Sequence, residues 1–321
     1  MRNLFALALL AATTTFAQDC DRACLEGMVN QYLDAMVAHN PFGLPLADRV
    51  RFSENEQFLE LGDAVWNNVT KIGNYKLYAA DPKSGQVGFL GTIEENGTPV
   101  GLGLRLKIEK RRIREIETLV IRDAGVGLAL EKIGKPDPLF LQTEASGARL
   151  NRGKMTDAVD LYFDGVEQGS AAKVPFDTEC NRVQNGMQTT NNDALKLPEL
   201  TWNPFALGCA AQLDTKFFNF VDRIYPRRYA VVDEERQLVF GFFLFQIPGT
   251  ILSIESTKGK VPVPSDYQSP TFLDVAEVYK LSGGKIRRID ALQTKIPYGM
   301  NSAYFGDDWR RPAKKTEADK K

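Results

Sequence analysis

The sequence predicts an α+β fold of two tandem units, each a long helix wrapped by a curved antiparallel sheet. Two observations predict it: an amphipathic helical stripe that occurs twice, and a strand–turn–strand segment that follows it both times. A long helix followed by several antiparallel strands forms an α+β unit, because the sheet has to bury the apolar stripe of the helix.

The two helices are predicted from apolar residues at helical spacing. Such a stripe is normally the side of a helix that faces the protein core. The first stripe consists of Leu25, Met28, Val29, Tyr32, Leu33, Met36 and Val37, and the second of Met155, Val159, Tyr162, Phe163 and Val166.

The repeated strands appear when residues 104–119 are laid over residues 277–292 without a gap. In this alignment Ile113 meets Ile286 and Ile116 meets Ile289. Both copies read as a β-hairpin, with charged turns at 109–112 and 282–285.

A second matching piece lies upstream of each hairpin. Asp81 followed by residues 87–93 corresponds to Asp233 followed by residues 239–245. Both aspartates are interpreted as turn formers, because Asp commonly bonds its own backbone in turns.

The first residues have the charged, apolar and small-residue order of a secretory signal peptide, with cleavage expected after Ala17. We therefore expect a secreted protein. The predicted parts are a signal peptide at 1–17, a first unit at 18–150, a second unit at 151–312, and a charged disordered tail at 313–321.

Forty Lys and Arg residues balance 41 Asp and Glu residues. The chain has no basic field for nucleic acid or an anionic membrane, and no later apolar run approaches the length of a membrane span. A small molecule is the expected partner, and the oligomeric state is open.

Four cysteines in a chain bound for an oxidising compartment favour two disulfides. Cys20 and Cys24 lie one helical turn apart, which is within the reach of a disulfide, so we pair them and pair Cys180 with Cys209. The competing interpretation is a zinc site, but the two pairs lie far apart and lack the short spacing of structural zinc ligands. No metal is expected.

Two glycosylation sequons begin at Asn68 and Asn96. The second lies between two alternating apolar runs and predicts an exposed hairpin turn, because an Asn-Gly pair accommodates positive φ.

The opening of the chain resembles a known superfamily. Residues 38–41, 44–47 and 50–55 look like the start of SnoaL-like domains of the nuclear transport factor two superfamily. Together with residues 174–176, 185–186, 188–190 and 297–300, they resemble a secreted tandem family of fungal and bacterial proteins with no established activity. The resemblance implies cone-shaped units, and its superfamily includes dehydratases, isomerases, cyclases and binding modules.

The candidate catalytic residues are His39 and Glu54. His39 is the one histidine in the chain, and histidine is the residue type to which an acid–base step near neutral pH would ordinarily fall. The alternative is that it caps the first helix or bonds a loop carbonyl. Arg51 and Asn55, which flank Glu54, are expected to position a carbonyl or carboxylate; the alternative is a surface ion pair and a turn.

Further candidate binding residues are Arg105, Arg182, Asn185 and Gln188. Arg105 alternates with leucines and is a possible anion clamp inside the first cone. The other three follow the second helix without a histidine, in a segment that carries Arg, then Asn, then Gln, as does the segment after the first helix. We therefore expect a catalytic cavity in the first unit and a binding role in the second.

The sequence has no nucleophile elbow, phosphate loop or dinucleotide fingerprint, so no cofactor is expected. Three hypotheses follow: a cofactor-independent lyase or isomerase acting on a small carbonyl compound, a binding protein for a small hydrophobic ligand, and a cell-surface interaction protein.

Overall fold

Two long helices form where the apolar stripes place them. The computed structural model describes residues 20–198 and 200–305. α1 (Arg22–Val37) and α4 (Arg152–Gln168) both begin after a side chain that caps a backbone N–H, Asp21 for α1 and Asn151 for α4. The predicted signal peptide and charged tail lie outside the described residues.

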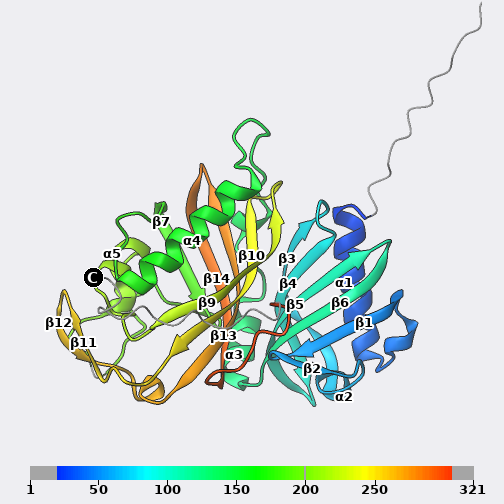
Figure 1. Ribbon diagram of the computed structural model, residues 1–321, viewed down its shortest axis with the longest axis horizontal. Helices are drawn as coiled ribbons and strands as arrows, with labels where there is room; N and C mark the ends of the chain where they lie inside the picture. The colour runs from blue at the N-terminus through cyan, green and yellow to red at the C-terminus, as the bar shows by residue number, and fades with distance from the viewer. Residues whose placement is uncertain (1–19, 199, 306–321) are drawn as a thin grey trace, which may run out of the picture.

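Between and after these helices the chain forms two six-stranded sheets, giving a mixed α+β fold (Figure 1). The first sheet comprises β1 (Leu46–Glu54), β2 (Gln57–Leu59), β3 (Val69–Asp81), β4 (Gln86–Glu95), β5 (Thr98–Glu109) and β6 (Arg112–Ile121). The second comprises β7 (Phe176–Gln184), β8 (Met187–Gln188), β9 (Arg223–Asp233), β10 (Leu238–Ile247), β13 (Thr271–Ser282) and β14 (Lys285–Pro297).

The strand order is the same in both sheets: β2-β1-β6-β5-β4-β3 in the first and β8-β7-β14-β13-β10-β9 in the second. The register is repeated as well. Where β1 runs parallel to β6, Phe52 lies opposite Ile116, and where β7 runs parallel to β14, Arg182 lies opposite Ile289. The predicted correspondence of Ile116 with Ile289 therefore holds in the pairing of the strands.

The predicted turns are confirmed. β5 and β6 are joined at Lys110–Arg111, and β13 and β14 at Gly283–Gly284, all four residues having positive φ. Asn96 and Gly97, with φ of 48° and 80°, form the expected turn between β4 and β5.

The remaining elements are short. The α-helices are α2 (Val65–Asn68), α3 (Ala124–Ile133) and α5 (Cys209–Asp214); the 3-10 helices are η1 (Pro41–Gly43), η2 (Pro138–Leu141), η3 (Pro204–Ala206) and η4 (Ser265–Tyr267); and a separate hairpin is formed by β11 (Ser253–Ser256) and β12 (Gly259–Pro262). No helix in the described part of the chain is long and apolar enough to cross a membrane.

Three main apolar cores hold the layers together. α1 packs on one face of the first sheet and α4 on one face of the second, and a third core joins the two sheets to each other. At this junction Gly88 and Gly103 allow close approach, because a Cβ atom on them would lie 2.4 Å from the Phe240 ring and 2.6 Å from the Ala276 Cβ.

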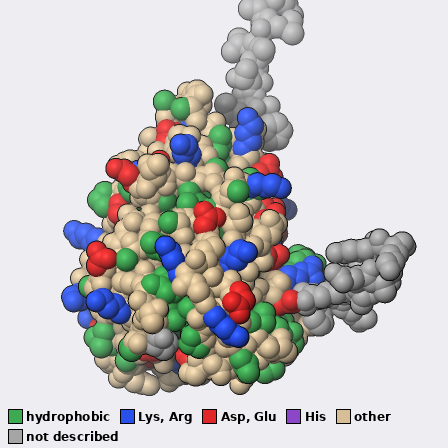
Figure 2. Space-filling view, turned by 90° about the vertical axis from the view of Figure 1, so that its left-hand side faces the viewer, with side chains coloured by type: hydrophobic (Ala, Val, Ile, Leu, Met, Phe, Trp, Pro, Cys, Tyr) green, Lys and Arg blue, Asp and Glu red, His purple; other side chains and the backbone are tan. Residues whose placement is uncertain are grey.

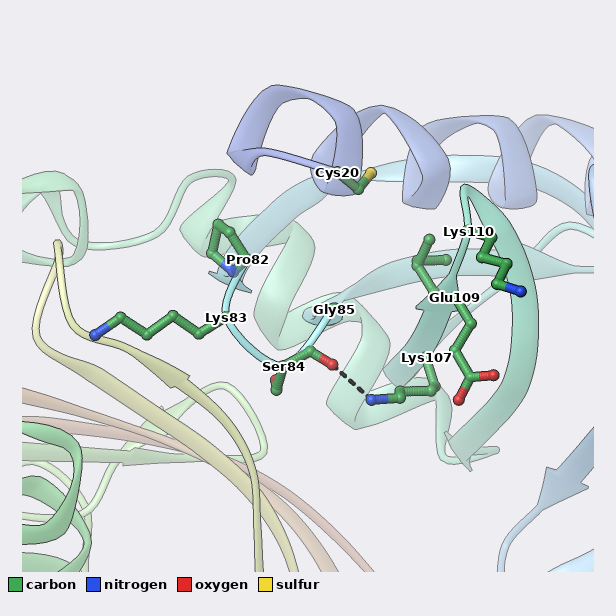
Figure 3. Close-up of a pocket in the computed structure, with 9 residues that line it drawn as sticks. Cys20, Pro82, Lys83, Ser84, Gly85, Lys107, Glu109 and Lys110 are labelled. Carbon is green, nitrogen blue, oxygen red and sulfur yellow. Dashed lines mark hydrogen bonds between the residues drawn. The ribbon is translucent and has the colours of Figure 1, made fainter. Parts of the chain in front are cut away.

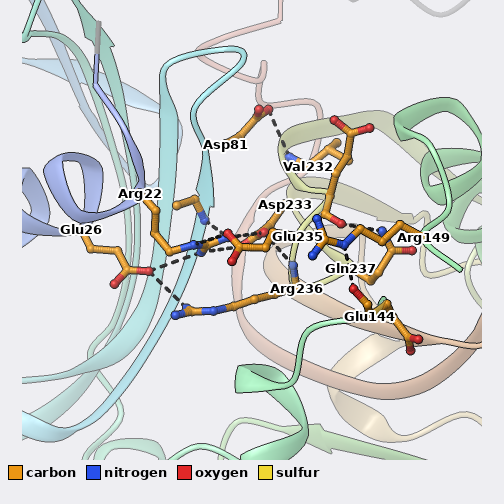
Figure 4. A network of polar contacts seen from close by, with 12 residues as sticks. Arg22, Glu26, Asp81, Glu144, Arg149, Val232, Asp233, Glu235, Arg236 and Gln237 are labelled. Carbon is orange, nitrogen blue, oxygen red and sulfur yellow. Dashed lines mark hydrogen bonds and ion pairs between the residues drawn. The ribbon is translucent and has the colours of Figure 1, made fainter. Parts of the chain in front are cut away.

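Reciprocal ion pairs also join each long helix to the sheet of the other half, and Figure 4 shows the one between Arg22 and Asp233. Arg22, at the start of α1, pairs with Asp233 at 2.6 Å, and Arg152, at the start of α4, pairs with Asp81. Each aspartate also accepts a backbone N–H three residues along the chain, as expected of a turn former. The two equivalent aspartates therefore also join the halves, a role that the sequence did not predict.

Both predicted disulfides are present. Cys20 is bonded to Cys24 and Cys180 to Cys209, with Cα atoms 5.3 Å and 5.8 Å apart. The bridge from Cys180 to Cys209 ties α5 to β7.

Candidate functional site

His39 lies two residues past the end of α1. Its side chain is exposed, its φ is 50°, and its Nδ1 atom bonds the backbone carbonyl of Trp66. This contact is the loop-carbonyl alternative that the sequence left open.

Glu54 is buried and holds the start of α2. Its carboxylate accepts the backbone N–H of Val65 at 2.9 Å and pairs with Arg122 at 2.7 Å. The two candidate catalytic residues thus have separate partners.

Arg51 and Arg105 are bound by glutamates on β6. Arg51 is exposed and pairs with Glu115, whereas Arg105 is 3% exposed and pairs with Glu115 at 2.9 Å and Glu117 at 2.6 Å. Both guanidinium groups also lie over the ring of Tyr304, at 5.1 Å and 4.5 Å. Arg105 is therefore part of a packed ion-pair network.

Asn55 and Asn185 have one structural task in common. The side chain of Asn55 accepts from the N–H and donates to the C=O of Val120, and Asn185 does the same with Gln293. Both residues have positive φ, and both bonds extend the pairing of a strand past its end. Gln188 is also held by the backbone, because its side chain donates to the Thr190 carbonyl at 2.9 Å.

The second sheet carries a cavity of about 590 Å³, within the range of small-molecule sites. Its lining comes from α4, from β7, β8, β10, β13 and β14, and from the segments that follow β8 and β12. The apolar lining includes Leu273, Val275 and a phenylalanine wall, which consists of Phe217, Phe218, Phe220 and Phe245. Arg182 and Asn185 line the same cavity, whereas His39, Arg51, Glu54, Asn55, Arg105 and Gln188 are not among the residues lining it.

Arg182 forms part of the polar end of this cavity and is 8% exposed. It donates to Gln212 at 2.6 Å and to Thr189 at 3.0 Å, reaches the Tyr162 hydroxyl at 3.5 Å, and lies 5.0 Å from the centre of the Phe218 ring. Its hydrogen-bond partners are all neutral groups.

Gln212 is wholly buried on α5 and accepts from Arg182 while donating to the backbone carbonyls of Thr189 and Pro204. The disulfide from Cys209 to Cys180 fixes α5 beside the strand that carries Arg182. The bridge therefore helps to position the polar end of the cavity.

Glu277 lies on β13, is 3% exposed, and also lines the cavity. Its carboxylate accepts a hydrogen bond from the Tyr279 hydroxyl at 2.5 Å. Burial raises the pKa of Glu277 to about 7, although the hydrogen bond from Tyr279 and the charge of Arg182 act in the opposite direction.

The first sheet has different residues at the positions equivalent to Arg182 and Glu277. Ile116 lies between Phe52 and Leu106, whereas Ile289 lies between Arg182 and Tyr279. Two residues earlier along the strand, Leu104 of the first sheet corresponds to Glu277 of the second. An Arg and a Glu in the second half thus stand where the first half has apolar core residues.

The space beside the first helix is also filled differently. Trp66 is buried against Tyr32, with ring centroids 5.2 Å apart and its indole N–H donating to the Tyr32 hydroxyl. In the second half, the hydroxyl of Tyr162 on α4 meets Arg182 instead, and Tyr162 lines the cavity.

Sequence reasoning missed Glu277, Tyr162 and the phenylalanine wall as site residues. The signal for Glu277 was present, because the repeat alignment sets this carboxylate against Leu104 within an apolar strand. Phe217, Phe218 and Phe220 carried no signal, since they lie between β8 and β9 in a segment with no counterpart in the repeat, and the alignment of β10 did not mark Phe245 as a lining residue.

A shallower hollow lies between Cys20, residues 82–85 and residues 107–110 (Figure 3). Its lysines do not converge: Lys83 and Lys110 point apart, and Lys107 donates to the backbone carbonyl of Ser84 at 2.5 Å. The face with α5 and the β11–β12 hairpin shows basic and acidic side chains interspersed (Figure 2). Neither surface presents a charged field.

The profile of a family described as "Domain of unknown function (DUF8021)" matches residues 148–293, which contain α4 and the cavity-bearing sheet apart from its end. No curated protein matches. A designed protein with a curved β-sheet is 16% identical over 32% of this chain and 88% of its own, with a TM-score of 0.27.

Proposed function

We propose that the chain binds a small, mostly apolar molecule in the cavity on its second sheet. The observation that carries this proposal is the difference between the halves: Arg182 and Glu277 line a cavity of about 590 Å³ where the first half has Phe52 and Leu104 in its core. Apolar walls with a few buried polar groups are typical of ligand sites.

The proposal also covers the fold of each unit, secretion and glycosylation. Each sheet with its helix is a SnoaL-like cone, at 18–150 and 151–312, an assignment supported by the repeated strand order. The protein is secreted, which is supported by the signal-like start and by two disulfides. Asn68 and Asn96 carry glycans, because both side chains are exposed.

A second candidate function is a cofactor-independent lyase or isomerase, with the acid–base step moved to Glu277. The observation that favours it is a carboxyl group whose pKa of about 7 suits proton transfer near neutrality, beside a cation that can stabilise an enolate. The cell-surface hypothesis expects a filled interior, so the cavity disfavours it.

Binding of the neutral fluorescent probe N-phenyl-1-naphthylamine tests the proposed function. Ala291 lines the cavity, so Ala291→Phe is expected to weaken binding at least about tenfold by filling the space. Ala172 is exposed, and Ala172→Phe is the matched control that leaves affinity unchanged. If Ala291→Phe does not fold, Met187→Trp at the cavity rim replaces it, because Met187 is 49% exposed. Equal binding by the folded cavity variant and the control contradicts the proposal.

Deuterium exchange separates catalysis from binding. Incubation with 2-decanone in D₂O is expected to label the carbons beside the carbonyl faster than in buffer if Glu277 removes a proton, and Glu277→Gln is expected to abolish the gain. No gain with the native protein leaves binding as the function and removes the enzymatic candidate.

A further inference from the structure

The polar end of the cavity holds a cation without an anionic partner. Among the described residues, no carboxylate forms an ion pair with Arg182, and its hydrogen bonds to Gln212, Thr189 and Tyr162 engage three of the five guanidinium donors. A buried charge is normally paired, because removing it from water is otherwise costly. The site therefore lacks an anion.

Glu277 does not supply a full negative charge. It is buried, it shares a hydrogen bond with Tyr279, and its pKa of about 7 leaves it substantially protonated near neutral pH. A protonated carboxyl group can donate one hydrogen bond to an incoming anion. Arg182 and Glu277 then act together as donors.

We infer that the ligand is an amphiphilic monocarboxylate, with its carboxylate at Arg182 and its apolar body against the phenylalanine wall. This inference rests on the proposed function and adds the chemical class of the ligand. A guanidinium group with two donors still available suits a carboxylate, which accepts two parallel N–H bonds. The walls exclude water from the pair and strengthen it.

Binding of this anion is coupled to the protonation of Glu277. Several titratable or charged groups face it or lie around the same cavity: Arg182 on β7, Tyr162 on α4, Asp290 on β14, Tyr279 on β13, and Lys196 and Asp266 in the cavity lining. A second negative charge beside Glu277 favours its neutral form. While the ligand's carboxylate stays ionised, affinity is therefore constant below pH 7, and it falls as pH rises above 7, where binding requires uptake of a proton.

Titration calorimetry with decanoate and 1-decanol tests the ligand class. At about pH 6, decanoate is expected to bind the native protein at least about tenfold more tightly than 1-decanol, because only the carboxylate pairs with Arg182. Arg182→Met is expected to remove this preference while it retains binding of 1-decanol. Because the two ligands differ in charge, this comparison distinguishes loss of carboxylate recognition from a general loss of structure. If Arg182→Met does not fold, the preference of the native protein for decanoate over 1-decanol still tests the inference.

The pH dependence gives an independent result. The affinity of the native protein for decanoate is expected to fall up to about tenfold per pH unit above pH 7, whereas Glu277→Gln is expected to bind without this dependence. Equal affinity for decanoate and 1-decanol, unchanged in Arg182→Met, overturns the carboxylate inference but leaves the cavity as a binding site. Failure of N-phenyl-1-naphthylamine, 1-decanol and decanoate alike overturns the proposed function as well.

Discussion

Arg182 stands in the second sheet where Phe52 stands in the first, and each lies opposite the equivalent isoleucine of the neighbouring strand. The same alignment sets Glu277 against Leu104. One copy of a repeated sheet thus keeps an apolar core, while the other buries two ionisable groups beside a cavity.

Restoring the apolar pattern is expected to stabilise the protein. Burial of ionisable groups away from water is costly, and replacement of a buried ion pair by apolar residues is often neutral or stabilising by about 1 to 4 kcal/mol, so Arg182→Phe combined with Glu277→Leu is expected to raise the free energy of unfolding by up to that amount. Urea unfolding measures it. The control pair Thr178→Phe and Lys295→Leu changes exposed residues on β7 and β14 and is expected to shift stability by less than about 0.5 kcal/mol. Destabilisation by the core pair beyond the control contradicts this account.

Stability is expected to depend on pH through Glu277. Its pKa is raised from 4.5 to about 7 on folding, so the native state favours the protonated form. The contribution is full below pH 4.5 and is lost as pH rises through 7, by about 3 kcal/mol in all. Comparison of Glu277→Gln with the native protein across this window isolates the effect. The pKa of Glu56 is also raised to about 7, so Glu56→Gln is the matched variant at a second buried carboxyl group and is compared across the same pH window. A stability difference between native and Glu277→Gln that does not change from pH 4.5 to 8 argues against the assignment.

The two disulfides are expected to differ in what they support. In the chain-entropy account, the bridge from Cys180 to Cys209, with a sequence separation of 29, contributes about 3 to 4 kcal/mol, and the bridge from Cys20 to Cys24 contributes about 2 kcal/mol. Serine replacement of Cys180 and Cys209 is also expected to weaken N-phenyl-1-naphthylamine binding, because α5 carries Gln212. Serine replacement of Cys20 and Cys24 provides the control, and equal losses of affinity would show that the longer bridge has no special role at the cavity.

His39→Gln is expected to leave ligand affinity unchanged and to cost at most about 1 kcal/mol, because the exposed side chain bonds one carbonyl at a helix end. Thermal unfolding beside the probe-binding assay measures both quantities. Loss of binding in a stable His39→Gln protein would indicate that the ligand-binding site lies in the first half.

Local patterns predicted the parts of the fold that depend on neighbouring residues. The helical stripes, the hairpin turns and the turns at Asp81 and Asp233 follow from spacing and from residues that accept positive φ or cap the backbone. The disulfides followed from chain geometry and compartment, and the repeat gave the register of both long hairpins.

The functional residues depended on partners that are distant in sequence. Arg51 lies four residues before Asn55 and Arg182 three residues before the equivalent Asn185, and this one-residue difference in strand register leaves Arg51 exposed and Arg182 buried. Arg105 reads as a possible anion clamp until Glu117, on the adjacent strand, is placed beside it. No local pattern shows which side of a strand meets a cavity.

A crystal structure of the native protein with decanoate tests the central claim most directly. The account predicts density for the alkyl chain along the wall formed by Phe217, Phe218 and Val275, with the carboxylate within hydrogen-bond distance of Arg182. Density for decanoate elsewhere, or a cavity that stays free of decanoate while calorimetry shows binding, would contradict it.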